Sequence, residues 1–172
     1  MDELGLEDQI DWSKAVVDSS SVRALFWEGA KTGPNSTDRG KNGSKRHLIS
    51  DGKGIPLAVI HTGAIVHYSQ QAIPLVDAIP AIKCPRGGRR RRPDTLYADR
   101  AYDVEAKIRK PLRQRRIIPM IAKGYTEHGS CFGKHRSIIE SVFAWLFQYR
   151  RLRVRYKNAT TSTKLSFPSD AL

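Results

Sequence analysis

The segment KRHLISDGKGIPLAVIHTG, residues 45–63, contains two β-rich runs on either side of the turn sequence DGKG. Two such runs joined by a short turn that contains glycine are typical of a β-hairpin. Upstream of this hairpin, the run AVVD at residues 15–18 predicts a short buried strand that ends at Asp18, where SSS follows as a turn. We therefore expect the fold to begin with three strands.

Downstream of the hairpin, helical and strand-like patterns alternate. They predict a short helix within residues 69–82, a strand at 95–99, a helix within 103–116 and a strand at 116–122. With the last helix, described next, the order of elements is β-β-β-α-β-α-β-α. Strands followed by alternating helices and strands favour an α/β fold with a mixed five-stranded sheet flanked by helices.

The last predicted helix, KHRSIIESVFAWLFQY at residues 134–149, has the clearest amphipathic pattern in the chain. Ile138, Val142 and Leu146 fall on one apolar face, as expected for a helix that packs on a sheet. At about 100° per residue, Glu140 lies about 60° beyond the edge of this apolar face. We therefore expect the helix to cover the sheet while Glu140 lies along its rim.

Three carboxylates are candidates for a metal site. Asp18 and Asp99 each end a predicted strand, and the C-terminal ends of neighbouring parallel strands meet at one edge of a sheet. Together with Glu140 they would offer three oxygen ligands, which suit Mg²⁺ or Mn²⁺. Two such ions, about 3.5–4 Å apart, support in-line displacement at a phosphodiester.

Each of these acids also has a simpler interpretation. An aspartate at the end of a strand is typical of a turn or N-cap residue. Glu140 follows Arg136 by one helical turn, a spacing that is typical of an ion pair on a helix surface. The spacing alone therefore leaves both interpretations open.

The net charge of +13 is concentrated in one part of the chain. Residues 86–157 carry 20 Lys and Arg against 6 Asp and Glu, whereas residues 1–85 carry 9 against 10. A basic region of this kind attracts polyanions, nucleic acid above all. Within it, the stretch CPRGGRRRRP at residues 84–93 is too polar to pack and predicts an exposed, mobile loop.

The composition also argues against several other classes of protein. The apolar runs are too short for membrane spans, and the acidic N-terminus is unlike a signal peptide. Cys84 and Cys131 have no CxxC or His-rich context, which argues against a disulfide scaffold and a zinc finger. We therefore expect a protein of a reducing cytoplasm.

Three blocks of sequence, in this order along the chain, are similar to the catalytic region of DDE transposases from bacterial insertion sequences. The similarity extends over about residues 13–157 and implies a ribonuclease-H-like fold. The blocks are TGPNSTDRGKNGSKRHLISDGKGIPLAV at 32–59, TLYADRAYD at 95–103 and HRSIIESVFAWLFQYRRLRVRY at 135–156.

The resemblance implies roles for individual residues. Asp18, Asp99 and Glu140 match the three catalytic acids of the family, which would hold two Mg²⁺ or Mn²⁺ ions, and Arg136 matches a basic residue that precedes the glutamate. The implied activity is metal-dependent DNA strand cleavage and strand transfer. The resemblance implies, in addition, a bacterial protein that associates with the nucleoid. The implied partners are double-stranded DNA, both transposon ends and target, a homo-oligomer on that DNA, and the product of an upstream transposase reading frame.

We expect the contacts to DNA phosphates to come from the basic side chains of the first Gly-rich loop, the arginine run and the last helix. These candidates are Lys41, Lys45, Arg46, Arg89, Arg90, Arg91, Arg92, Arg100, Arg136, Arg150 and Arg151.

The expected organisation is an acidic N-terminal segment at residues 1–12, the catalytic domain at 13–157 and a disordered tail at 158–172. Two other interpretations stay open. The chain could be a catalytically inactive, DNA-binding remnant of a transposase. It could also be a ribonuclease-H-like nuclease that cleaves without strand transfer.

Overall fold

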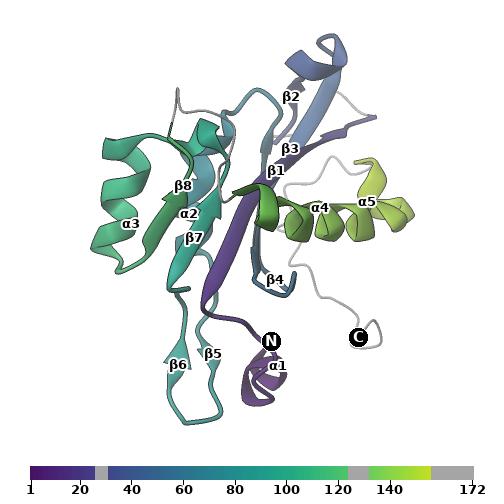
Figure 1. Ribbon diagram of the computed structural model, residues 1–172. Coiled ribbons are helices and arrows are strands. Elements are labelled where there is room, and N and C mark those ends of the chain that lie inside the picture. Colours follow the sequence, from purple (N-terminus) through teal and green to yellow (C-terminus); the bar gives the residue numbers. More distant parts are fainter. Residues whose placement is uncertain (26–30, 124–131, 156–172) are drawn as a thin grey trace.

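The computed structural model describes residues 1–25, 31–123 and 132–155 (Figure 1). Within these ranges, six strands form one mixed sheet in the order β4, β3, β1, β7, β8, with β2 beside the start of β3. The strands are β1 Lys14–Arg23, β2 Gly33–Pro34, β3 Asn42–Asp51, β4 Pro56–Gly63, β7 Thr95–Ala98 and β8 Ile118–Ile121.

The directions of the strands match the expected α/β fold. β3 runs antiparallel to β1 and to β4, whereas β1, β7 and β8 run parallel to one another. The predicted hairpin is therefore β3 with β4, and the five predicted strands are all present. The two-residue strand β2 is an addition that the sequence patterns did not indicate.

Helices cover both faces of this sheet (Figure 1). α4 packs on one face, while α2 and α3 pack on the other. The short helix predicted within 69–82 is confirmed as α2, and it ends before Pro80. The helices are α1 Asp2–Leu6, α2 Ala72–Asp77, α3 Lys110–Gln114, α4 Phe132–Gln148 and α5 Arg150–Arg153, with 3₁₀ turns at Ser36–Asp38, Tyr68–Gln71 and Arg100–Tyr102 and a π-helical turn at Glu105–Arg109.

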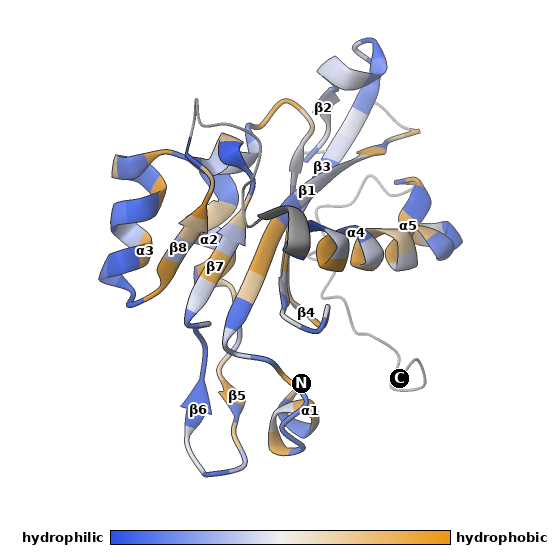
Figure 2. Ribbon diagram, in the orientation of Figure 1, coloured by the Kyte–Doolittle hydropathy of each residue, from blue (hydrophilic) through white to orange (hydrophobic). Residues whose placement is uncertain are grey.

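The side chains of β1 alternate between the two faces of the sheet. Val16 is buried against α4, whereas Ala15 and Val17 belong to the core on the α2 side. The expectation that this strand ends at Asp18 is wrong, because the serines that follow stay extended and pair with β3 as far as Arg23. Figure 2 shows the consequence, since apolar residues fill the first half of β1 and polar residues the second.

The predicted last helix is confirmed as α4. It crosses β1 and presents an apolar stripe to the sheet, as the i, i+3, i+4, i+7 spacing requires. Each fully buried side chain of this size contributes roughly 1.5–3 kcal/mol, so this stripe fixes the position of the helix that carries Glu140. The buried side chains in this contact are Val16, Leu48, Ile139, Val142, Phe143 and Leu146.

The stretch at 84–93 differs from the expected mobile loop. Within it, β6 Arg89–Arg90 pairs with β5 Ile82–Lys83, which directly precedes the stretch, and the two form a hairpin at the end of the molecule where α1 lies (Figure 1). The arginines are held by backbone carbonyl groups rather than by solvent alone. Arg91 donates to the carbonyl oxygens of Ile79 and Asp77, and Arg92 donates to that of Arg115.

Two further expectations concern the ends of the chain and membranes. The expected disordered tail at 158–172 lies outside the described residues. Among the helices that are described, none has the length and apolar character needed to cross a membrane.

Candidate active site

The structure brings Asp18 and Asp99 together. Val17 of β1 and Ala98 of β7 are register partners on parallel strands, and each aspartate is the next residue along its strand. Neighbouring strands in a sheet are about 4.8 Å apart, so the two carboxylates start from adjacent backbone positions. They meet at the edge of the sheet where β7 ends.

Each of these carboxylates uses one oxygen to accept a neighbouring backbone N–H. Asp18 accepts from Ser19 and Asp99 accepts from Arg100, both at 2.7 Å. Asp99 is thus the N-cap of a 3₁₀ turn, as its simpler interpretation predicted. Within the described residues, the other oxygen of each carboxylate receives no hydrogen bond, which leaves it able to bind a cation.

The electrostatic surroundings of Asp18 indicate a cluster of acids. Burial raises the pKa of the Asp18 carboxyl above its ordinary value, and the charges of Asp99 and Glu140 raise it further. The backbone N–H of Ser19 and the guanidinium of Arg136 act in the opposite direction. Asp18 therefore stands among two other acids, where a bound cation would relieve the repulsion.

Glu140 lies on α4, and its side chain is exposed. Its Oε1 atom accepts a hydrogen bond from Nε of Arg136 at 2.8 Å, so the ion pair that the spacing suggested is present. In the part of the chain that the structure describes, no three His, Cys, Asp or Glu side chains lie close enough together to hold one metal ion. The structure therefore brings two of the predicted acids together and keeps the third on Arg136.

A cavity of about 250 Å³ opens beside Asp18 and Asp99. Lys45 also lines this cavity, and its Nζ atom donates to the carbonyl oxygen of Val66 at 2.9 Å. A cavity lined by carboxylates, a cation and hydroxyl groups suits a phosphodiester that meets a metal. The residues that line it are Asp18, Ser19, Ser21, Asn35, Ser36, Thr37, Lys45, Tyr68, Asp99 and Tyr102.

Two tyrosines form the aromatic wall of this cavity. The ring centroids of Tyr68 and Tyr102 are 5.0 Å apart, and Tyr102 is fully buried. Burial raises the pKa of both hydroxyl groups, and the charges of Asp18 and Asp99 add to the effect. Both hydroxyl groups therefore stay protonated at neutral pH.

Sequence reasoning did not assign a role in the site to Tyr102 or Asn35. Tyr102 follows Asp99 by three residues, and the 3₁₀ turn between them directs its ring into the core. The Asn35 side chain accepts from the backbone N–H of Thr37 at 3.2 Å and so shapes the loop beside the cavity. The spacing of the tyrosine was a usable signal, whereas the loop gave none.

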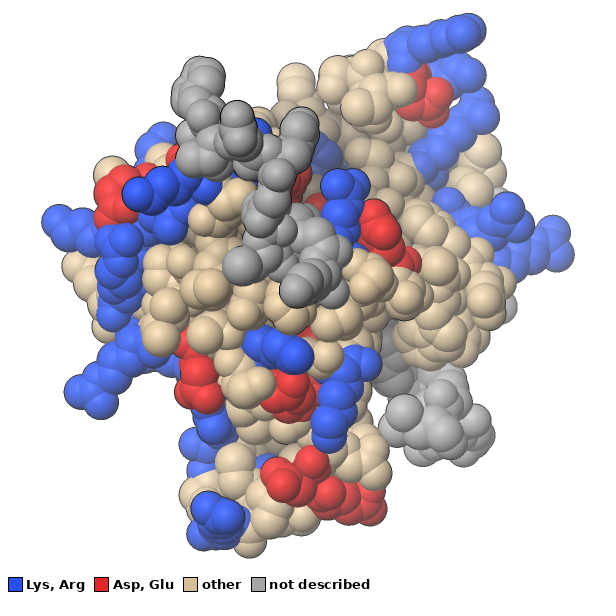
Figure 3. All heavy atoms as spheres, in the orientation of Figure 1, with Lys and Arg blue, Asp and Glu red and all other residues tan. Residues whose placement is uncertain are grey.

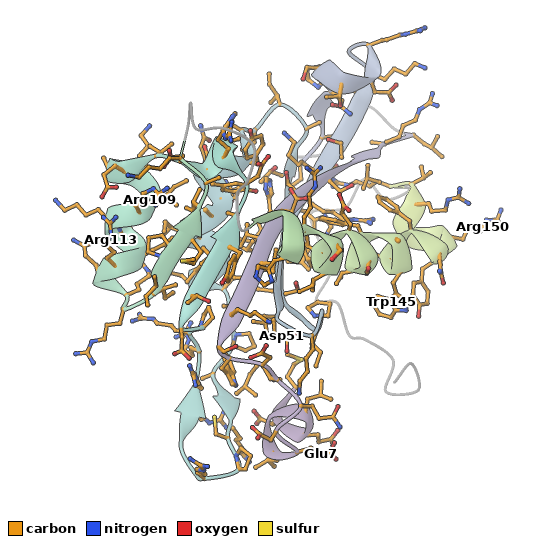
Figure 4. The ribbon with its side chains drawn as sticks, viewed as in Figure 1. Glu7, Asp51, Arg109, Arg113, Trp145 and Arg150 are labelled. Carbon is orange, nitrogen blue, oxygen red and sulfur yellow. The ribbon has the colours of Figure 1, made fainter. Side chains whose placement is uncertain are left out.

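The candidate DNA-binding residues fall into separate places. Lys45 lines the cavity, and Arg46, the next residue of β3, is buried on the opposite face of the sheet. Arg100 directly follows Asp99 and is half-buried. Lys41 is exposed before β3, and Arg150 is exposed at the far end of α4 (Figure 4). Arg151 lies in α5, and its side chain is outside the described part of the chain.

The run Arg89–Arg92 lies at the other end of the molecule from the acids. Besides its bonds to carbonyl groups, Arg90 forms an ion pair with Asp94, and Arg89 approaches Asp2 at 3.6 Å. Figure 3 shows Lys and Arg distributed over several edges of the molecule rather than in one patch. The structure therefore does not bring this run to the cavity.

Comparison with known proteins agrees with this architecture. The family model of the transposase DDE domain matches residues 11–165. The chain is also 52% identical, over 131 residues, to the proposed transposase for insertion sequence element IS402 of Burkholderia cepacia. That match covers 76% of this chain, and the chain spans 62% of the relative's length. The chain therefore belongs to the transposase DDE domain family.

Proposed function

We propose that this chain cleaves DNA strands at the ends of an insertion sequence and joins the freed ends to target DNA, in a reaction that depends on divalent metal ions. The observation that supports this most strongly is the adjacency of Asp18 and Asp99. Each has an oxygen without a hydrogen bond among the described residues, and both border a cavity with a basic, hydroxyl-rich wall.

Members of this family generally use divalent metal ions. The donors in this chain fit such ions, because carboxylate oxygens without His or Cys are the ligands of Mg²⁺ and Mn²⁺. We assign Asp18 and Asp99 as ligands, with Glu140 as the third acid and two ions in the complete site. When bound, the ions would supply charge neutralisation at the phosphodiester and a more acidic water molecule.

Arg136 has a positioning role in this proposal. It pairs with Glu140 at 2.8 Å, and its charge lowers the pKa of Asp18, which favours the ionised form of Asp18 that binds a cation. Because the Glu140 side chain is 56% exposed, rotation about its own torsions is open to it. Such a rotation would move the carboxylate from Arg136 toward Asp18.

We assign the contacts to DNA phosphates to Lys45 in the cavity, to Arg100 and Arg136 near the acids, and to basic residues outside the cavity. The latter are Lys41, Arg46, Arg150 and Arg151. The run Arg89–Arg92 has internal partners, and we assign it mainly to the fold. Because two transposon ends must be cut, the proposal includes a homo-oligomer on DNA and a possible role for an upstream-frame product.

Strand cleavage and strand transfer on duplexes that carry the terminal inverted repeats of the element test this proposal. The charge-to-amide variants Asp18→Asn, Asp99→Asn and Glu140→Gln should lose metal-dependent cleavage and retain DNA binding. Asp94→Asn, an exposed aspartate at the opposite end of β7, is the matched control and should cleave normally.

Three outcomes would count against the proposal in different ways. Full activity in any one of the amide variants contradicts the assignment of that acid. Cleavage without joining identifies a nuclease of the same fold. DNA binding with no response to Mg²⁺ or Mn²⁺ identifies an inactive remnant.

A further inference from the structure

Arg46 is a buried cation that lacks a partner of opposite charge. Only 7% of its surface is exposed, and burial lowers the pKa of its guanidinium to about 10. Among the residues that the structure describes, no carboxylate or carbonyl group bonds to it. The guanidinium nitrogens of Arg46 are not fully enclosed by the protein, so they remain in contact with solvent.

The surroundings of Arg46 are basic. Its register partner on β4 is His61, whose pKa falls to about 4 through burial and through the charges of Arg46, Lys31 and Arg155. Arg155 is fixed in place, because it donates to the carbonyl oxygen of Lys31 at 2.7 Å and to Oγ of Ser44 at 2.6 Å. His61 is therefore neutral, and the charged groups among the described residues that act on it, Arg46, Lys31 and Arg155, are all positive.

An arrangement of this kind is unfavourable in the free protein. A buried charge without a partner loses hydration and gains no compensating interaction. The cost is recovered when an anion binds, since a guanidinium forms its strongest hydrogen bonds with phosphate and carboxylate groups. The arrangement therefore indicates an anionic ligand from outside the chain.

The position of Arg46 relates this site to the acids. Arg46 is the register partner of Ser20, which lies two residues beyond Asp18 on the same face of β1. From strand spacing and rise, the Cα atoms of Asp18 and Arg46 are about 8 Å apart. Successive phosphates of one DNA strand rise by about 3.4 Å along the helix axis and also turn about it, so they lie farther apart than this rise, and the span corresponds to about one nucleotide.

We propose that Arg46, with Arg155 and neutral His61 beside it, binds one phosphodiester group of the DNA strand whose scissile phosphate lies at Asp18. The inference rests on the proposed function for the identity of the anion. The phosphate would accept hydrogen bonds from the guanidinium and lie among the positive charges that act on His61. Lys45, on the other face of β3, serves the cavity and not this site.

The substitution Arg46→Met tests the inference in two ways. It keeps the side-chain volume and removes the unpaired charge, so the melting temperature without DNA should rise or stay the same. Affinity for a short DNA duplex of arbitrary sequence, measured in EDTA, should fall about tenfold. The slope of log K against log salt should decrease in magnitude by about 0.9, as expected for one lost phosphate contact.

Two further measurements locate the contact. Neutral methylphosphonate linkages, moved one position at a time along a duplex that carries the terminal inverted repeat, should weaken binding of the wild type at every contacted phosphate. At one of these positions the linkage should have no effect on Arg46→Met. The control Arg113→Met removes an exposed arginine of α3, across the molecule from α5 (Figure 4), and should leave that position unchanged.

Unchanged affinity and salt slope in Arg46→Met, at an unchanged or raised melting temperature, overturn the inference. If Arg46→Met is destabilised, Arg46→Lys decides, because it keeps the charge. A slope of log K against log salt in Arg46→Lys that equals that of the wild type supports a phosphate contact. A lower melting temperature together with a smaller slope in Arg46→Lys contradicts it. Because DNA binding in EDTA does not depend on cleavage, the binding measurements test the Arg46 site even if the cleavage proposal is wrong.

Discussion

Asp18 and Asp99 occupy neighbouring positions on the parallel strands β1 and β7, one residue beyond the register pair Val17 and Ala98. Two carboxylates in such positions repel one another, and burial adds to the cost of ionising Asp18. The site therefore lowers the stability of the free protein, as sites prepared for a charged ligand commonly do. This relationship leads to measurable consequences.

The variant Asp18→Asn should be more stable than the wild type at neutral pH without metal. The pKa of Asp18 in the folded state lies above its ordinary value of 3.8. At pH values between the unfolded-state pKa and the folded-state pKa, the folded state therefore binds more protons than the unfolded state. Stability from this group falls as the pH rises through that window, and the full cost is present at pH 7. Removing the charge should contribute about 1 kcal/mol, or about 2–4 °C in Tm. Thermal unfolding in EDTA measures it, and a lower Tm for Asp18→Asn would contradict the description of the site.

The variant Arg136→Gln should shift the pH dependence of cleavage. Arg136 lowers the pKa of Asp18, so its loss raises that pKa and moves the acidic limb of the pH–rate profile to higher pH. Because the Arg136–Glu140 pair is exposed, the free energy of unfolding should change by less than about 0.5 kcal/mol. Arg113→Gln is the control. An unshifted pH–rate profile in Arg136→Gln would contradict the positioning role of Arg136.

The variant Arg91→Ala should affect stability rather than DNA binding. Its guanidinium donates to the carbonyl oxygens of Ile79 at 3.1 Å and of Asp77 at 2.8 Å, which lie at the end of α2. Loss of these bonds should cost about 1–2 kcal/mol of the free energy of unfolding in urea. A large loss of DNA affinity at unchanged stability would contradict this structural role and would indicate that Arg91 contacts DNA.

The variant Asp51→Ala should be strongly destabilised. Asp51 is fully buried and accepts backbone N–H groups of Asp11, Lys53 and Ile55 at 2.8, 3.0 and 2.7 Å. It ties the β3–β4 turn to the segment before β1 (Figure 4). Three unsatisfied donors should cost about 3 kcal/mol in total. Asp51→Asn keeps an acceptor and should lose less, so equal stability of Asp51→Ala and the wild type would contradict this role.

Much of the fold was predictable because hydrophobic periodicity and turn chemistry determine it. The DGKG turn and the apolar runs around it predicted the β3–β4 hairpin, and the spacing of Ile139, Val142 and Leu146 agrees with the buried stripe of α4. The end of β1 was wrong because polar residues can continue a strand when a neighbouring strand pairs with them. The hairpin β5–β6 was missed because its stability comes from arginine bonds to distant carbonyl groups, which leave no periodic signal.

The site was predictable to a similar extent. Asp18 and Asp99 could be paired because parallel strands end together, and the register brings them side by side. The position of Glu140 depends on torsions of its side chain and on Arg136, which a helical spacing does not determine. Burial of Arg46 without a counter-charge depends on the tertiary fold and has no trace in the local sequence.

The most direct test of the account is the binding of Mn²⁺ to the DNA-bound chain, followed by electron paramagnetic resonance. We expect the wild type and Asp94→Asn to bind Mn²⁺ alike, and Asp18→Asn and Asp99→Asn each to bind at least about tenfold more weakly, as expected when a metal ligand loses its charge. Equal Mn²⁺ affinity in all four proteins, or no binding by the wild type, would contradict it.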